Sequence, residues 1–328
     1  MHKVTFFPLG NADCCRIDLS DGKGKKLLFD YADCRDPEDE NDLRIDLPAS
    51  LKDDLDATGR DYYDVVAFTH ADDDHIHGMS EFFWLEHAEK YQGEGRIKIR
   101  ELWVPAAVII EKGLKDEAKI LQAEARHRLI NGRGIRIFSR PDRLKEWLEE
   151  HEIRPDDRWG LITDAGQVAP GLSKECDGIE FFVHSPFAVR AGEEIIDRNE
   201  AALVMQATFS DGGRETRMIL GSDCEHESWC DIVKITRSHG RDERLKWDIF
   251  KISHHCSYTA LSAEKGEEKT KPDAEVEWLF GQGGPCGVLV ATCKPIPSDD
   301  ADDQPPHRQA ANYYRLFRVC SGLTPFSG

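Results

Sequence analysis

The chain has 328 residues and a formal net charge of −19, and no apolar stretch approaches the roughly 18–20 residues that a membrane-spanning helix needs. Its length predicts one large α/β domain or two small ones, and its charge disfavours a bare phosphate backbone as partner unless basic residues or bound cations gather locally. Ten scattered cysteines without a CxxC pair, and an N-terminus without the pattern of a signal peptide, indicate reduced thiols and a cytoplasmic protein.

The first predicted elements are short strands. Three apolar runs between turns predict an antiparallel meander, over residues 4–7, 15–19 and 26–30. An acidic segment over 35–60 follows, in which we expect one short helix near 47–55. Residues 64–68 then predict a buried strand that leads into a cluster of histidines and aspartates.

Helix and strand patterns alternate after Gly78, and strand patterns return after residue 178. In the first stretch the periodicity predicts helices over 79–91, 111–130 and 143–151 and strands over 97–104 and 135–138. In the second it predicts strands over 179–184, 201–209, 217–220, 247–253 and 287–291, a helix between the third and fourth of these, and a final helix over 307–319. These patterns together predict two β-sheets with helices outside.

The densest chemistry follows the strand at 64–68, where six of the eight positions from His70 to His77 are His or Asp. Carboxylates packed together repel one another and lose hydration, and a bound cation offsets both costs. A loop that leaves a strand can direct residues 70, 72 and 74 into one cleft. The alternative is a solvated acidic loop in which Asp73 or Asp74 caps the next helix, but the flanking histidines and the apolar strand favour a metal site.

The run from Thr69 to Gly78 resembles the first motif of the metallo-β-lactamase fold hydrolases, with Asp72 in place of the usual second histidine. It is similar to the branch that contains the cytoplasmic domain of the DNA-internalisation competence protein. Further similar motifs occur in the same order, over 10–13, 28–30, 183–186, 198–204, 219–223, 251–257 and 306–307. Two departures are Gly221, which stands one place earlier than in the branch, and Cys256, which stands where the branch has Gly.

The resemblance implies an αββα sandwich of two mixed β-sheets flanked by helices, as a single domain over 1–328 with a helical insertion within 79–178. It also implies two divalent metal ions. His70, Asp72 and His184 would bind one of them, and Asp74, His75 and either His254 or His255 would bind the other, with Asp223 between the two. Since carboxylate is a harder donor than imidazole, Asp72 makes Mn²⁺, Mg²⁺ or Fe more competitive with Zn²⁺.

Several of these residues have alternative interpretations. His184 is a ligand or only a turn residue after a strand, and His307 is a general acid or phosphate contact or only the start of the last helix. His77 is a surface residue or a substrate contact, and we expect Lys251 to neutralise nearby carboxylates. The catalytic residues that we predict are Asp74 and His307.

The sequence thus predicts a metal-dependent hydrolase in which a water held by two metal ions attacks the substrate. We expect a phosphodiester substrate such as DNA or RNA, because the branch that the chain resembles is associated with DNA degradation during uptake. One alternative keeps the site but changes the substrate to an ester, lactone or thioester. Another has the acidic surface bind a protein partner, with the metal domain as a subunit of a larger assembly.

Overall fold

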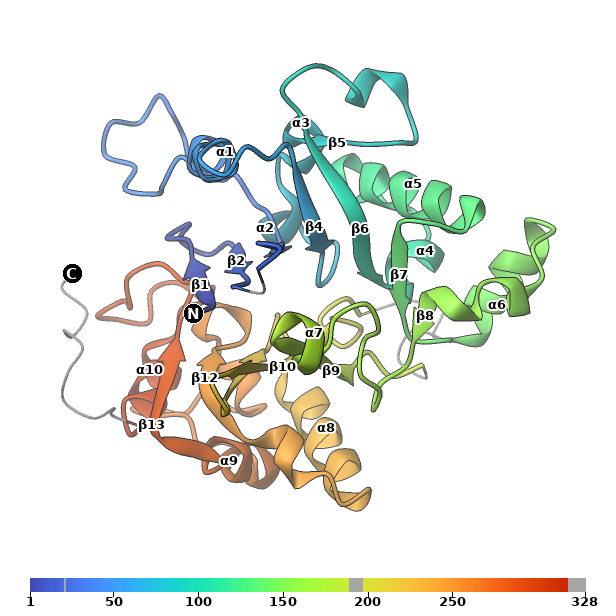
Figure 1. Ribbon diagram of the computed structural model, residues 1–328. Coiled ribbons are helices and arrows are strands. Elements are labelled where there is room, and N and C mark those ends of the chain that lie inside the picture. Colours follow the sequence, from blue (N-terminus) through green and yellow to red (C-terminus); the bar gives the residue numbers. More distant parts are fainter. Residues whose placement is uncertain (21, 189–196, 318–328) are drawn as a thin grey trace.

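The computed structural model describes residues 1–20, 22–188 and 197–317, and two β-sheets face each other in it (Figure 1). The first sheet has the order β1-β2-β3-β4-β6-β7-β8, and β5 also pairs with β6. Its strands are β1 (Lys3–Phe6), β2 (Cys15–Asp18), β3 (Lys26–Phe29), β4 (Tyr62–Ala67), β5 (Phe83–Trp84), β6 (Ile97–Pro105), β7 (Ile135–Phe138) and β8 (Ile162–Thr163). The pairs β1–β2 and β2–β3 are antiparallel, as the predicted meander requires, and the other pairs are parallel.

The second sheet has the order β13-β12-β11-β10-β9. Its strands are β9 (Ile179–Ser185), β10 (Val204–Asp211), β11 (Arg214–Leu220), β12 (Trp247–Lys251) and β13 (Gly283–Val290). The strands β9, β10 and β11 are antiparallel, whereas β11, β12 and β13 are parallel. Both sheets are therefore mixed.

Helices cover the outer face of each sheet (Figure 1). The α-helices are α1 (Leu47–Asp56), α2 (Asp73–Ile76), α3 (Met79–Phe82), α4 (Ala106–Ile110), α5 (Asp116–Asn131), α6 (Asp142–Glu150), α7 (Lys174–Asp177), α8 (His226–Ser238), α9 (Ala274–Phe280) and α10 (Arg308–Tyr314). Short 3-10 turns are η1 (Glu89–Tyr91), η2 (Pro155–Asp157), η3 (Trp159–Leu161), η5 (Asp242–Leu245), η6 (His254–Cys256) and η7 (Tyr258–Ala260). Within the described ranges, no helix is long and apolar enough to cross a membrane.

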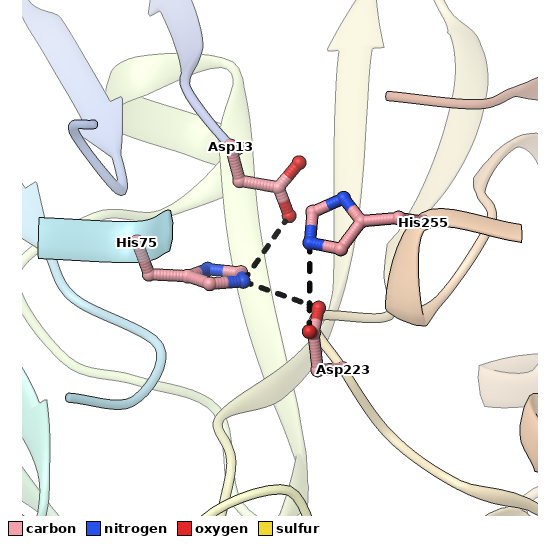
Figure 2. A group of neighbouring side chains, drawn as sticks. All are labelled: Asp13, His75, Asp223 and His255. Carbon is pink, nitrogen blue, oxygen red and sulfur yellow. Dashed lines mark ion pairs between the residues drawn. The ribbon is translucent and has the colours of Figure 1, made fainter. Parts of the chain in front are cut away.

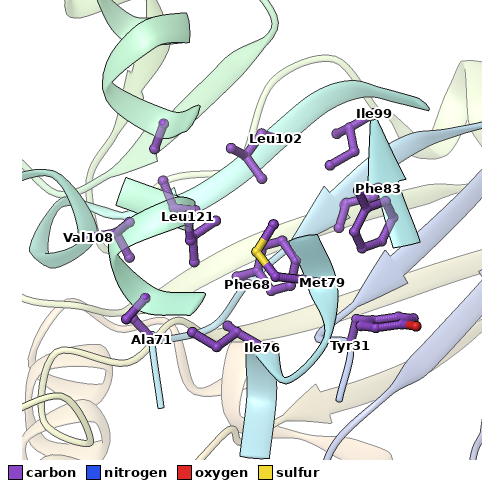
Figure 3. Close-up of a cluster of buried hydrophobic side chains, with 14 of the residues drawn as sticks. Tyr31, Phe68, Ala71, Ile76, Met79, Phe83, Ile99, Leu102, Val108 and Leu121 are labelled. Atoms are coloured by element: carbon purple, nitrogen blue, oxygen red, sulfur yellow. The ribbon is translucent and has the colours of Figure 1, made fainter. Parts of the chain in front are cut away.

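Three apolar layers hold the sheets and helices together. Because strand residues alternate between faces, β3 points Leu27 and Phe29 toward the second sheet and Leu28 toward the helices. The ring of Phe29 lies 5.4 Å from that of Phe181 on β9, across the space between the sheets. Figure 3 shows the layer outside the first sheet, where Met79 and Leu121 pack against the strands. This arrangement confirms the predicted αββα sandwich.

The prediction of one helix over residues 79–91 is wrong. The chain makes only the single turn α3 there, then pairs Phe83 and Trp84 with β6. Farther on, the backbone N–H groups of Glu86 and His87 donate to the Glu124 carboxylate of α5, at 3.0 and 2.9 Å. These N–H groups therefore donate to a side chain that is distant in the sequence, and not to the carbonyls of a continuing helix. Sequence periodicity does not reveal such a contact.

Two other helices differ from prediction at their ends. The helix predicted over 111–130 begins at Asp116, and the separate helix α4 precedes it. The final helix, predicted over 307–319, runs as α10 from Arg308 to Tyr314, and positions 318 and 319 lie outside the described residues. The segment 79–178 that was predicted to contain an insertion supplies β5 to β8 of the first sheet and helices α3 to α6 on its outer side.

Candidate metal centre

Four buried side chains from four separate segments converge on one another (Figure 2). Asp13 precedes β2, His75 lies on α2, Asp223 follows β11, and His255 follows β12. One ligand atom of each lies within 4.8 Å of the others. His75 Nε2 is 3.2 Å from Asp223 Oδ1 and 3.7 Å from Asp13 Oδ2, and His255 Nε2 is 3.6 Å from Asp223 Oδ2. Below, these four residues are called the central group.

Both histidine rings of the central group are oriented from behind. His75 Nδ1 donates to Asp30 Oδ2 at 2.9 Å, and Asp30 is itself fixed by the N–H and hydroxyl of Thr69. His255 Nδ1 donates to the carbonyl of Thr292 at 2.7 Å. A ring that donates through Nδ1 presents Nε2 as a ligand atom, and this is how most metal-binding histidines are held.

Several polar atoms in the centre lack hydrogen-bond partners. Among the described residues these include His75 Nε2, Asp223 Oδ1 and Asp13 Oδ1, all of which are buried. A buried polar atom without a partner costs about 1–3 kcal/mol, so folded proteins leave few of them. His75 Nε2 and Asp223 Oδ1 lie 3.2 Å apart in the central group, so one divalent cation would satisfy both atoms. The residues therefore fit a metal ion.

The charges of the centre also suit a cation. Burial acts to lower the pKa of His75, but Asp223 and Asp30 outweigh it and raise that pKa well above the ordinary value. For Asp223, burial acts to raise the pKa, yet His75 and His255 hold it well below the usual range. Lys251 pairs with Asp13 and helps to lower its pKa against the effect of burial. The carboxylates are thus ionised, and a metal ion would displace the proton that His75 carries.

A second group that could hold an ion consists of His70, Asp74 and His75, so it shares His75 with the central group. His70 Nε2 is buried without a hydrogen bond and lies 3.5 Å from Asp72 Oδ2. Burial and the neighbouring His75 lower the pKa of His70, which keeps its ring neutral. Asp74 Oδ2 lies 3.0 Å from His255 Nε2, so it connects the two groups.

The structure places Asp72 at the edge of these groups, in an ion pair. Its Oδ1 accepts from Arg198 Nη1 at 2.5 Å, and Arg198 also contacts Glu111 at 2.7 Å. These residues, with Asp197 and Asn199, line an open pocket of ≈ 350 Å³. Neither Arg198 nor Glu111 belongs to the predicted site.

His184 is separated from the predicted metal ligands. Ile179, Phe181 and Val183 of β9 face the space between the sheets, so His184 points to the opposite face. There its Nε2 donates to the carbonyl of Arg244 at 3.0 Å, and burial lowers its pKa to about 4. In the part of the chain that the structure describes, neither group that could hold a metal includes His184. Its position corrects the predicted ligand set, because the register of β9 directs it outward.

The structure brings His255 into the central group and leaves His254 outside. His254 Nδ1 lies 3.3 Å from Glu225 Oε1 and 3.2 Å from Thr259 Oγ1. The backbones of the two histidines, and of Cys256 after them, all have positive φ. This tight turn directs the two rings differently, and the sequence alone did not separate them.

His307 has both ring nitrogens engaged by the backbone. Its Nδ1 accepts from the N–H of Tyr258 at 3.3 Å, and its Nε2 donates to the carbonyl of Asp303 at 3.1 Å. Burial lowers its pKa, in keeping with this neutral ring. The contacts join the start of α10 to η7, and neither group that could hold a metal ion in the described residues includes His307.

The departure at Gly221 has a steric cause. A Cβ at this position would collide with Ser253 Oγ, so the end of β11 can approach β12 only through glycine. The next residue, Ser222, has a φ of 48° and donates from Oγ to Thr69 Oγ1 at 2.8 Å. This contact joins the turn that carries Asp223 to the strand end that carries His70.

Sequence reasoning assigned no role to Asp13, Asp30 or Arg198. Asp13 and Asp30 lie in motifs that match the resembling branch and in turns next to strands, which was the available signal. Arg198 also lies in a matched motif, but nothing in the sequence indicates that it reaches Asp72.

No protein-family model and no curated protein matches the chain. Solved structures do match. One is described as a new diphosphatase from the PhnP family, with 10% identity, a TM-score of 0.30, and coverage of 77% of this chain and 74% of that one. Another is the class B3 di-zinc metallo-β-lactamase LRA-12 from an Alaskan soil metagenome, with 13% identity, a TM-score of 0.34, and coverage of 84% and 90%.

A third match is BJP-1, a subclass B3 metallo-β-lactamase of Bradyrhizobium japonicum, with 14% identity, a TM-score of 0.31, and coverage of 84% and 89%. These are proteins to which the chain is similar.

Proposed function

We propose that the protein is a metal-dependent hydrolase of phosphodiesters that uses a metal-activated water. The observation that carries the proposal is the central group, four buried and converging donor residues whose free atoms suit a cation. Divalent ions bound there would acidify a water and polarise the substrate. We propose two ions, Zn²⁺ or Mn²⁺, with Mg²⁺ or Fe as alternatives, since the two carboxylates and two imidazoles of the central group form a mixed oxygen and nitrogen donor set.

In this proposal the protein residues hold and orient the ligands of the centre. Asp30 and the Thr292 carbonyl fix the rings of His75 and His255, so that both Nε2 atoms keep their direction. Asp74 has a side chain that is 36% exposed, at the edge of the centre. Burial acts to raise its pKa, but the hydrogen bond from His255 and the charge of His75 lower it to about 2. Asp74 is therefore ionised at neutral pH, and in this proposal its carboxylate would help His70 and His75 to hold the second ion.

The substrate class rests on chemistry and on the resemblance to the competence-protein branch. A phosphodiester is anionic, and the negative net charge of the chain repels it except where cations are bound. Metal ions at the centre would supply this charge at the scissile bond. We accordingly propose DNA, RNA or a smaller phosphodiester as the substrate.

The test is hydrolysis of bis(p-nitrophenyl) phosphate, single-stranded DNA and RNA with Mn²⁺, Zn²⁺, Mg²⁺ or Fe²⁺. Asp223→Asn should lower kcat/KM by about 10³-fold or more, because it removes a charged donor from the centre. Asp177→Asn is the matched control, since Asp177 is a buried aspartate that pairs with Lys25 outside the centre. It should keep activity within about threefold.

Two results would contradict the proposal. One is an absence of phosphodiester hydrolysis with all four metals while a chromogenic lactone or ester is cleaved, which would favour the ester-hydrolase alternative. The other is an Asp223→Asn protein as active as wild type, which would remove the central group from the reaction and favour a role as a binding subunit.

A further inference from the structure

Lys251 is a buried lysine beside the central group. It is the last residue of β12, and Ile249, two residues earlier on this strand, packs against the apolar layer between the sheets. Since strand residues two apart share a face, Lys251 lies on the same face of β12. Its ammonium group contacts Asp13 Oδ2, and the residue is only 5% exposed. A protein cation is thus enclosed against one member of the central group.

The carboxylates around Lys251 outnumber it. Asp13, Asp30 and Asp223 are each at most 3% exposed, and Asp30 lines the same small cavity as Lys251 and Asp13. Burial acts to lower the pKa of Lys251, but Asp13 and Asp223 outweigh it and raise that pKa, so the ammonium group is charged at neutral pH. Buried carboxylates that lie close together need such a partner, because they repel one another and have lost hydration.

The Lys251 ammonium group and a metal ion in the central group would be attracted to the same carboxylates. In the chain without an ion, Lys251 favours the ionised form of Asp13 against the effects of burial and of Asp223. With a divalent ion on these residues, the ion and the ammonium group repel each other. Loss of the Lys251 charge should therefore destabilise the metal-free protein more than the metal-bound protein. By linkage, it should also tighten metal binding.

We propose that Lys251 takes the place of a cation in the central group, so that the group is stable without a metal ion, and that the same charge weakens metal binding. Lys251 acts through Asp13 and is a positioning residue. The inference rests on the metal centre of the proposed function, but its test measures metal affinity and unfolding and uses no substrate. A lysine that only orients Asp13 as a ligand predicts the opposite sign, because its loss would weaken metal binding.

The experiment is calorimetric titration of the metal-free full chain with Mn²⁺. Lys251→Gln keeps a hydrogen-bond donor beside Asp13 and removes the charge, so it should bind Mn²⁺ at least about tenfold more tightly than wild type. In scanning calorimetry, the metal-free variant should have a lower Tm than metal-free wild type. The increase in Tm on addition of saturating Mn²⁺ should be larger in the variant, by at least about 2 °C.

Lys26→Gln is the matched control. Lys26 is also a buried lysine, 6% exposed, and it pairs with Asp18 and Asp54, both at 2.7 Å. It begins β3, whereas Asp30 follows the other end of that strand, so its charge lies away from the central group. Its loss should lower Tm by the same amount with and without Mn²⁺, and should change the Mn²⁺ affinity by less than about threefold.

Unchanged or weaker Mn²⁺ binding by Lys251→Gln would overturn the proposal. So would a variant that stays unfolded in saturating Mn²⁺, because a bound ion is expected to replace the missing charge, whereas a variant that folds only with Mn²⁺ would support it. Absence of Mn²⁺ binding by wild type would overturn the metal centre and this inference with it. If the expected affinities are found but no phosphodiester is cleaved, the proposed function fails and the role of Lys251 stands.

Discussion

The turn that carries His255 has an unusual backbone. His254, His255 and Cys256 have φ angles of 49°, 48° and 66°, in the left-handed region that disfavours residues with a Cβ. The cost is about 1–2 kcal/mol for each such residue. This conformation places the ring of His255 between the Thr292 carbonyl and Asp223. The branch that the chain resembles has Gly at the position of Cys256. A glycine there would remove the backbone strain at one of the three residues with positive φ.

The strain at Cys256 predicts that the usual order of stability, in which an Ala variant is more stable than a Gly variant, is reversed at this position. Cys256→Ala keeps the Cβ and the strain and loses a buried sulfur, whereas Cys256→Gly also releases about 1 kcal/mol of strain. We therefore expect the Gly variant to be at least as stable as the Ala variant in urea unfolding. Cys230 within helix α8 is the control, where Gly should be less stable than Ala by about 1 kcal/mol. An Ala variant that is more stable than the Gly variant at Cys256 as well as at Cys230 would contradict the strain at Cys256.

At the scale of elements, one buried carboxylate fixes the chain between β5 and η1. Glu124 accepts from the N–H groups of Glu86 and His87, from His87 Nδ1 and from Arg128 Nε. The N–H groups of the chain between β5 and η1 thereby find a hydrogen-bond acceptor, as they would have in a helix. The residue is fully buried, so these contacts are needed to offset the loss of hydration.

Glu124→Gln should lower the free energy of unfolding by about 3 kcal/mol near pH 7, because it leaves Arg128 without its buried partner. Burial acts to raise the pKa of Glu124, but His87 and Arg128 lower it to about 2, below its value in the unfolded chain. The stabilisation is therefore complete above about pH 4.5 and is lost as the pH falls toward 2. Urea unfolding from pH 7 to pH 3 measures it.

The gap between wild type and Glu124→Gln should accordingly narrow below about pH 4.5. Glu149→Gln, at an exposed position of α6, is the control and should change stability by less than about 0.5 kcal/mol. A gap that stays constant down to pH 3 would show that the charge of Glu124 is not what stabilises the segment.

At the scale of the whole molecule, both sheets contribute to the central group (Figure 2). Asp13 and His75 lie in the segments that connect strands of the first sheet, and Asp223 and His255 lie in those of the second. Removal of metal with a chelator should lower Tm by about 5 °C, which corresponds to an ion present at about 100 times its Kd. Scanning calorimetry with and without chelator measures the shift, and added Mn²⁺ or Zn²⁺ should restore it. Asp223→Asn should show no shift, and an equal Tm in wild type with and without chelator would contradict metal binding.

Local patterns in the sequence predicted most of the strands and two β-sheets with helices outside, because alternation and helical periodicity are read within a few residues. The αββα sandwich itself was implied by the family resemblance. The run from His70 to His75 was equally visible, since its charge cannot be buried without a partner. The outward direction of His184 was not visible in the sequence, because it depends on which face of β9 meets the other sheet. Contacts such as Arg198 with Asp72 join distant segments, and single-sequence patterns do not report them.

The origin of the central group in both sheets has a consequence for the order of folding. A chain with only one sheet formed presents two of the four side chains, which is too few to hold a divalent ion firmly. Tight binding must then follow the docking of the sheets. An ion bound at that late step would slow their separation and leave the rate of folding unchanged, so it would extend the lifetime of the folded molecule.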